Sequence, residues 1–243
     1  MVRLVMITAR EGSSRLPNKV TLPFGGYDSL VAFVFDRSTL IANSIVTVCT
    51  GPRALNPILS SICQRRNIPI FHGAEKNKVL RWAECIEAFQ ADVAHGLDCD
   101  DPFFDWDRVS ESLEMSRSSN LITLPSLYSD GGGATEGVSF TADAINEFVS
   151  EDSNREFEMI YEPFSKSVNG VGQLSDPPYA KKGVRMTVDY QADFEFLSHL
   201  GVEFGSCIDR KELEALIPTP TPNFSWNSQW KSNQRKITSL EAN

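Results

Sequence analysis

The stretch LVMITAREGSSRLPNK, residues 4–19, decides how the chain can fold. Its first part, residues 4–8, is a short apolar run with the length and composition of a buried strand. A glycine, two serines and three cations, Arg10, Arg15 and Lys19, follow directly. Small residues with positive charges at a strand end are the usual composition of a phosphate site. The commoner alternative for a basic loop taken alone is a solvated turn whose cations pair with carboxylates, but the position at a strand end favours function.

The rest of the chain repeats this order of short apolar runs and helical segments. The predicted strands are residues 4–8, 45–50, 68–71, 92–97, 121–124 and 184–188, and the predicted helices are residues 28–42, 57–66, 78–90, 102–113 and 209–216. The alternation predicts an α/β fold with a doubly wound, mostly parallel sheet. Ligands of such folds bind at the carboxyl ends of strands, so we expect the site after Thr8, Thr50, Leu97 and Val188.

Two regions depart from the alternation. Residues 125–180 include the glycine-rich run SDGGGATEGVSF, and we expect a small lid or a dimerisation arm there, which would allow a homodimer. Residues 218–243 are rich in proline and asparagine, which indicates a C-terminal tail that is either wrapped on the surface or partly disordered. The main domain is therefore predicted to span residues 1–217.

Composition narrows the class of protein. The formal net charge of −9 argues against a broad nucleic-acid surface, which needs a basic face, but it leaves room for a local site for a small anion. The five cysteines form no CxxC pair, as is typical of reduced thiols. No run approaches the roughly 20 apolar residues of a membrane span. We therefore expect a cytoplasmic protein that binds neither nucleic acid nor membrane.

A group of carboxylates follows the fourth predicted strand. Asp98, Asp100 and Asp101 crowd its end, where adjacent carboxylates repel each other unless a cation lies among them. Oxygen ligands of this kind suit Mg²⁺. Asp101 is alternatively the N-cap of a helix that begins one residue later, and both interpretations hold together if Asp100 binds the metal. Asp189 follows the last predicted strand and can reach the same edge as Asp100.

Four stretches resemble one known family. ITAREGSSRLPNK resembles the signature A-R-x-G-S-x-R-L-P-x-K of the cytidylyltransferases that activate acidic sugars, the acylneuraminate and 3-deoxy-manno-octulosonate enzymes. FHGAEKNKVLRW, DCDDPFFD and MTVDYQADFEFL resemble that family's F-x-G-x-x-x-D-V-L-x-R-[FY], G-D-x-P-L-[IV]-D and L-T-V-D-x-x-x-D-[LF]-x-x-[IL]. The blocks keep the family's order over residues 7–197, and the greatest similarity is to the SpsF-like branch of spore-coat polysaccharide biosynthesis.

The resemblance implies a nucleotide-diphospho-sugar transferase fold of the GT-A-like type. It also implies a Mg²⁺-dependent transfer of CMP from CTP to an acidic sugar or a similar small acidic acceptor, with release of pyrophosphate, in polysaccharide or glycoconjugate biosynthesis. By this resemblance Arg10, Arg15 and Lys19 hold the triphosphate, and Asp100 and Asp189 bind Mg²⁺. The remaining implied residues are Ala9, Gly12, Ser13, Ser14, Thr50, Gly51 and Arg81 for the nucleotide, and Glu136, Arg155 and Glu156 for the acceptor.

Three residues depart from the family pattern. Asn77 replaces an acidic residue, Cys99 takes the place of a smaller residue before the metal-binding aspartate, and Glu11 places an acid inside the phosphate loop. Two alternatives stay open on the same scaffold. One is a nucleotidyltransferase that uses another NTP with a sugar phosphate, or CTP with a phosphonate. The other is a nucleotide-binding protein without catalytic activity.

Overall fold

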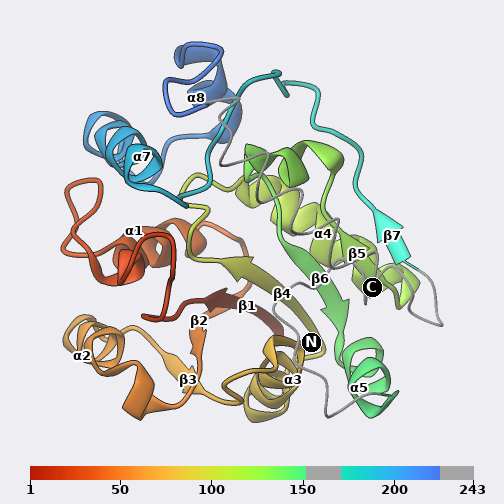
Figure 1. Ribbon diagram of the computed structural model, residues 1–243. Helices are drawn as coiled ribbons and strands as arrows, with labels where there is room; N and C mark the ends of the chain where they lie inside the picture. Colours follow the sequence, from red (N-terminus) through yellow and green to blue (C-terminus); the bar gives the residue numbers. More distant parts are fainter. Residues whose placement is uncertain (152–170, 225–243) are drawn as a thin grey trace, which may run out of the picture.

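A computed structural model describes residues 1–151 and 171–224. Seven strands of these residues form one sheet in the order β3-β2-β1-β4-β6-β5-β7 (Figure 1). Neighbours β3, β2, β1 and β4 are parallel, β6 is antiparallel to both β4 and β5, and β7 is parallel to β5. The strands are β1 (Arg3–Thr8), β2 (Ile45–Thr50), β3 (Ile70–His72), β4 (Val93–Asp98), β5 (Ile122–Leu124), β6 (Val138–Thr141) and β7 (Val171–Gln173).

Helices cover both faces of the sheet because successive strand residues point to opposite sides. Val5 and Ile7 of β1 belong to the hydrophobic cluster that includes α1, α2 and α4, whereas Leu4 and Met6 pack with α3 and α5. The α-helices are α1 (Leu30–Ser38), α2 (Pro57–Arg66), α3 (Lys78–Phe89), α4 (Trp106–Ser119), α5 (Ala142–Glu151), α7 (Gln191–Phe204) and α8 (Arg210–Leu216). This arrangement confirms the predicted doubly wound, mostly parallel α/β fold.

The described helices include none with the length and apolar character needed to cross a membrane.

The prediction of a strand at residues 184–188 is wrong. The segment is buried, but its backbone bonds to loops instead of a neighbouring strand: Met186 N donates to Gly132 O (2.8 Å) and Val188 N donates to Asp100 O (2.7 Å). Apolar composition cannot distinguish a buried strand from a buried extended loop, since both conceal their side chains. The second bond places Asp189 beside the loop that carries Asp100.

The predicted start of the fourth helix is also wrong. Helix α4 begins at Trp106, and its N-cap is Asp105, not Asp101. The Asp105 carboxylate accepts hydrogen bonds from the backbone N–H groups of Asp107 (2.9 Å) and Arg108 (3.2 Å). Asp101 instead closes a turn, in which its N–H donates to Asp98 O (3.1 Å).

Part of the predicted arm belongs to the sheet. Strand β6 lies between β4 and β5, and α5 and β7 are also built from residues 125–180, which corrects the extent of the arm. Residues 152–170, with the predicted acceptor residues Arg155 and Glu156, lie outside the described part of the chain. The first residues of the predicted tail pack against the domain, since Thr221 and Asn223 are buried.

Two buried arginines anchor the loop between β4 and α4. Arg37 Nε donates to Phe104 O (2.8 Å), and its guanidinium stacks 4.5 Å from the centre of the Trp106 ring. Arg210 donates to Phe103 O (2.7 Å) and Gly133 O (2.6 Å). Because an irregular loop cannot pair its carbonyl groups in a ladder, buried carbonyls need such donors. The arginines thereby hold the loop that follows Asp100.

Replacing Arg210 should destabilise the fold strongly. Arg210→Met should lower the free energy of unfolding by about 3–5 kcal/mol, because it leaves the fully buried Glu214 carboxylate, 3.1 Å from the guanidinium, without its cation. Urea denaturation measures the loss. Lys211→Met, at the exposed neighbouring position, is the matched control and should change stability by no more than about 0.5 kcal/mol. Equal effects of the two substitutions would contradict the anchoring role.

Candidate active site at the strand ends

The carboxyl ends of three parallel strands meet at one edge of the sheet. Thr8, the last residue of β1, is in register with Cys49 of β2 on one side and with Asp98 of β4 on the other. The loop after β1 and the acids after β4 are therefore neighbours in space, as expected for the carboxyl ends of parallel strands.

Lys19 joins two carboxylates that are distant in sequence. Its side chain is buried, and Nζ donates to Asp100 Oδ2 (2.5 Å) and to Val188 O (2.6 Å) and lies 3.7 Å from Asp189 Oδ1. Burial alone would lower the pKa of Lys19, but Asp100 and Asp189 together raise it above its ordinary value. The ammonium group is therefore charged, and it brings together three of the residues that the sequence singled out.

The three crowded carboxylates after β4 are each accommodated differently. Asp98 pairs with Lys78 (2.6 Å) and Asp100 pairs with Lys19. Burial would raise the pKa of Asp100, but the Lys19 ammonium outweighs it and lowers the pKa below its usual value. Asp101 has no such cation among the described residues, and burial, together with Asp100 and Asp98, raises its pKa well above the usual range. Two lysines thus relieve the repulsion predicted from sequence at Asp98 and Asp100, and the raised pKa of Asp101 favours its neutral form.

Asp189 is held from both sides. Arg15 Nη2 lies 2.7 Å from Asp189 Oδ1, and Arg185 Nη2 donates to Oδ2 (3.0 Å). Asp193 positions the backbone, since its Oδ2 accepts from the N–H groups of Asp189 and Tyr190, both at 3.0 Å. These contacts fix the carboxylate at the sheet edge before any ligand arrives.

Glu11, the acid inside the phosphate loop, forms part of a helix cap. Its Oε1 accepts from Leu59 N (2.8 Å) in the first turn of α2, while its own N–H donates to Asn56 Oδ1 (3.0 Å). Asn56 is the N-cap of α2, but its side chain does not cap the helix itself. Glu11 supplies that cap, so its side chain binds α2 and the loop is tied to the helix by two bonds.

The other predicted residues of the loop differ in exposure. Gly12 and Ser14 are exposed, Ser13 is half-buried, and Ala9 is buried with its N–H directed to Cys49 O (3.4 Å). A Cβ atom at Gly12 would meet no atom of the described chain within 4 Å, which leaves its backbone approachable. Arg10 is exposed. The loop therefore presents backbone and side-chain donors to solvent.

The second strand end holds a polar group without a partner. Thr50 is fully buried, and its Oγ1 has no hydrogen-bond partner among the described residues. Gly51 O accepts from His72 Nδ1 (3.0 Å). Arg81 is buried and donates to Ala74 O (2.7 Å) and Glu75 O (3.1 Å), so it fixes the loop after β3.

Lys78 is a candidate residue that the sequence analysis missed. Besides its pair with Asp98, its Nζ lies 4.9 Å from the centre of the Trp82 ring, and Trp82 Nε1 donates to Thr8 Oγ1 (3.0 Å). The available signal was its position as the first residue of α3, directly after the N-cap Asn77. That position puts it at the same sheet edge, but its partner on β4 follows only from packing.

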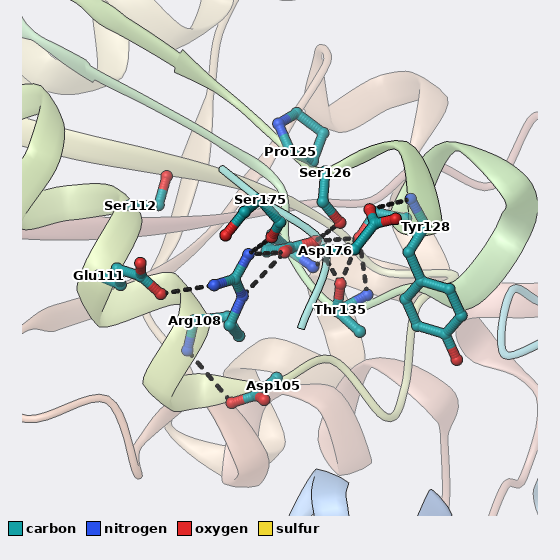
Figure 2. A network of polar contacts seen from close by, with 12 residues as sticks. Asp105, Arg108, Glu111, Ser112, Pro125, Ser126, Tyr128, Thr135, Ser175 and Asp176 are labelled. Carbon is teal, nitrogen blue, oxygen red and sulfur yellow. Dashed lines mark hydrogen bonds and ion pairs between the residues drawn. The ribbon is translucent and has the colours of Figure 1, made fainter. Parts of the chain in front are cut away.

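Glu136, a predicted acceptor residue, lies in the interior. Its side chain is fully buried, and Oε1 accepts from Arg108 Nε (3.0 Å) and Nη2 (2.7 Å). Its other oxygen accepts from Ser126, Ser129 and Thr135. Figure 2 shows Arg108 at the centre of this network, also bound to Glu111 and Ser175. An acceptor would reach Glu136 only by displacing these donors.

Asp100 and Asp189 are suited to hold Mg²⁺ with help from a substrate. No group of three or more His, Cys, Asp or Glu residues converges to hold a metal within the described ranges. Two carboxylates are nevertheless the usual protein share of a magnesium site that is completed by substrate phosphates and water. Asp189 Oδ1 is buried and has no hydrogen-bond partner among the described residues, although two cations face it. The donor set therefore fits a hard divalent cation.

The sheet and its flanking helices form a nucleotidyltransferase-like α/β fold. No family model matches the chain. In sequence the chain is similar to the spore coat polysaccharide biosynthesis protein SpsF of Bacillus subtilis (strain 168), with 24% identity over 210 residues that cover 81% of this chain and 85% of SpsF.

Two solved structures share the fold. A cytidylyltransferase from Leptospira borgpetersenii superposes with a TM-score of 0.72 and 18% identity, covering 89% of this chain and 93% of that one. A CMP:2-keto-3-deoxy-manno-octonic acid synthetase complexed with CTP gives a TM-score of 0.65 and 15% identity, covering 84% and 99%. With SpsF, they confirm the resemblance to the acidic-sugar cytidylyltransferases that the motifs indicated.

The Glu11 cap predicts a measurable stability effect. Glu11→Ala should lower the free energy of unfolding by about 1 kcal/mol, because α2 loses the acceptor for its Leu59 N–H group. Glu11→Gln keeps an amide oxygen in place and should lose clearly less. Urea denaturation of both variants tests this. A loss for the glutamine variant as large as that for the alanine variant would rule out capping as the role of Glu11.

Proposed function

We propose that this protein is a Mg²⁺-dependent nucleotidyltransferase that transfers CMP from CTP to an acidic sugar or similar small acidic acceptor and releases pyrophosphate. The observation that carries the proposal is that Asp100 and Asp189 both face the Lys19 ammonium group, beside a basic, exposed loop. The similarity to SpsF supports a role in cell-surface polysaccharide or glycoconjugate biosynthesis. The fold shared with a synthetase complexed with CTP supports CTP as the nucleotide.

The reaction needs positioning and charge neutralisation more than a protein nucleophile. An acceptor oxygen attacks the α-phosphorus in line, and the bond to the bridging oxygen of pyrophosphate breaks. Asp100 and Asp189 would hold Mg²⁺, which when bound neutralises charge on the phosphates and polarises the reacting centre. Arg15, whose side chain is 42% exposed, lies at the rim of the acids and can turn to the triphosphate. Arg10 supplies a further exposed cation.

The nucleoside end would lie over the carboxyl end of β2. Thr50 carries a buried hydroxyl whose oxygen has no partner among the described residues, and a base or ribose is a suitable partner for such a group. Gly51 follows at the same strand end, where a Cβ atom would lie 3.6 Å from Glu75 Cα. Arg81 acts indirectly, because its bonds to Ala74 and Glu75 shape the loop that borders this end.

The deciding experiment is a screen of pyrophosphate release with each of the four NTPs against acidic sugars, sugar phosphates and phosphonates. Release with CTP and an acidic sugar is the expected outcome. Release only with another NTP or another acceptor would replace the substrate assignment and leave the reaction class standing. CTP binding without turnover on any acceptor would favour a nucleotide-binding protein without catalytic activity.

A substitution of Asp189 tests its assignment as a ligand of Mg²⁺. Asp189→Asn should lower the rate of pyrophosphate release by at least about a hundred-fold, because it removes one of the two charges that hold Mg²⁺. Circular dichroism and the melting temperature should show an intact fold. Asp143→Asn, at an exposed position in the first turn of α5, is the control and should keep the rate. Near-normal turnover of the Asp189 variant would overturn the metal assignment.

A further inference from the structure

Lys19 lies where the proposed metal would bind. Its ammonium nitrogen is surrounded by oxygens from two separate segments: Asp100 Oδ2 at 2.5 Å, Val188 O at 2.6 Å and Asp189 Oδ1 at 3.7 Å. Its side chain is only 8% exposed, so these oxygens, not water, satisfy its charge. A lysine that binds only the triphosphate would not need such a shell of protein acceptors.

A divalent cation cannot share this position with the ammonium group. Mg²⁺ binds carboxylate oxygens at about 2.0–2.1 Å, so an ion held by Asp100 and Asp189 would stand within a few ångströms of Nζ. Two positive centres that close in a buried site repel each other strongly. The binding of Mg²⁺ therefore requires Lys19 to move, and a moved ammonium requires another anion.

The triphosphate of the nucleotide is the anion that can take over. Lys19 ends the basic loop, and its flexible four-carbon stem allows the ammonium group to turn while the backbone of η1 (Lys19–Thr21) stays in place. We propose that Lys19 keeps the metal site closed in the free protein and releases it only when CTP offers phosphate oxygens, so that Mg²⁺ and CTP bind as a coupled pair. This inference rests on the proposed function, since it takes Asp100 and Asp189 as the metal ligands.

If Lys19 closes the metal site in this way, the binding of Mg²⁺ and the binding of CTP depend on each other. Mg²⁺ alone should bind the unmodified protein weakly, because it must displace an ion pair without replacing it. With CTP present, Mg²⁺ should bind at least about ten-fold more tightly, and by linkage Mg²⁺ should tighten CTP binding by the same factor. Isothermal titration calorimetry with Mg²⁺ alone, CTP alone and each in the presence of the other, without an acceptor, measures this coupling.

For the Lys19→Met variant we expect tight binding of Mg²⁺ in the absence of CTP. Without the ammonium group, Asp100 and Asp189 face each other unneutralised, so Mg²⁺ alone should bind about ten-fold more tightly than to the unmodified protein and should raise the melting temperature of the variant. Lys211→Met is the matched control, since it removes an exposed lysine charge on α8 and should change the affinity for free Mg²⁺ by less than about three-fold. Adding Asp100→Asn to Lys19→Met should abolish the gain.

Three results would overturn the proposal. They are Mg²⁺ alone binding the unmodified protein as tightly as with CTP, Lys19→Met binding free Mg²⁺ no more tightly than the unmodified protein, and Lys211→Met matching the gain of Lys19→Met. The first uses only the unmodified protein, so it decides even if the variants fail to fold. If Mg²⁺ and CTP bind and turn over while Lys19→Met shows no gain, this inference fails alone. If CTP does not bind with or without Mg²⁺, the proposed function fails with it.

Discussion

The contact between the Lys19 ammonium and two carboxylates is the constraint on which the site depends. Asp100 and Asp189 come from segments far apart in the chain, and both are largely withdrawn from water. Two acids in such surroundings repel unless a cation lies between them, so the loop after β1 must deliver one. The same requirement explains why a protein with a net charge of −9 concentrates basic residues in that loop.

Buried arginines supply the rigidity that this contact needs. The acids lie on irregular segments, whose carbonyl groups have no strand neighbours to bind. Arg37 and Arg210 donate to the carbonyls of Phe104 and Phe103, in the loop that follows Asp100 and Asp101. Arg185 binds Asp189 and Asp193 in the other segment. A guanidinium group suits this task because its several donors point in fixed directions and can bind more than one acceptor at once.

The departures from the family pattern have local physical explanations. Glu11 caps α2, and Asn77 caps α3 by accepting from Leu80 N (2.9 Å), a role that an aspartate in its place would also perform. Cys99 is buried, and burial, followed by the charge of Asp100, raises the pKa of its thiol well above the usual value. It therefore acts as a small apolar residue and not as a nucleophile. None of the three changes the group of charges at the strand ends.

The sequence by itself determined the fold class and most of the location of the candidate site. The order of short apolar runs and helical segments is a local signal, and in a parallel sheet it brings the strand ends to one edge. Lys19 and Asp100 could therefore be assigned to that edge before their contacts were known, whereas Asp189 was assigned to it through a strand that does not form. Only the tertiary structure decided how these charges pair, because ion pairs between distant segments depend on how loops pack and not on local periodicity.

The contrast between local pattern and packing also accounts for each difference between the predictions and the structure. The segment before Asp189 has the composition of a strand, but its hydrogen bonds go to loops, and strand β6 enters the sheet antiparallel, which no local pattern revealed. Glu136 stands in the glycine-rich run of the predicted lid or arm, yet it is buried and pairs with Arg108 from α4. The Lys78 ammonium group lies over the Trp82 ring and pairs with Asp98. In each case a contact between residues far apart in the chain decides the outcome, and such contacts exist only once the layers have packed.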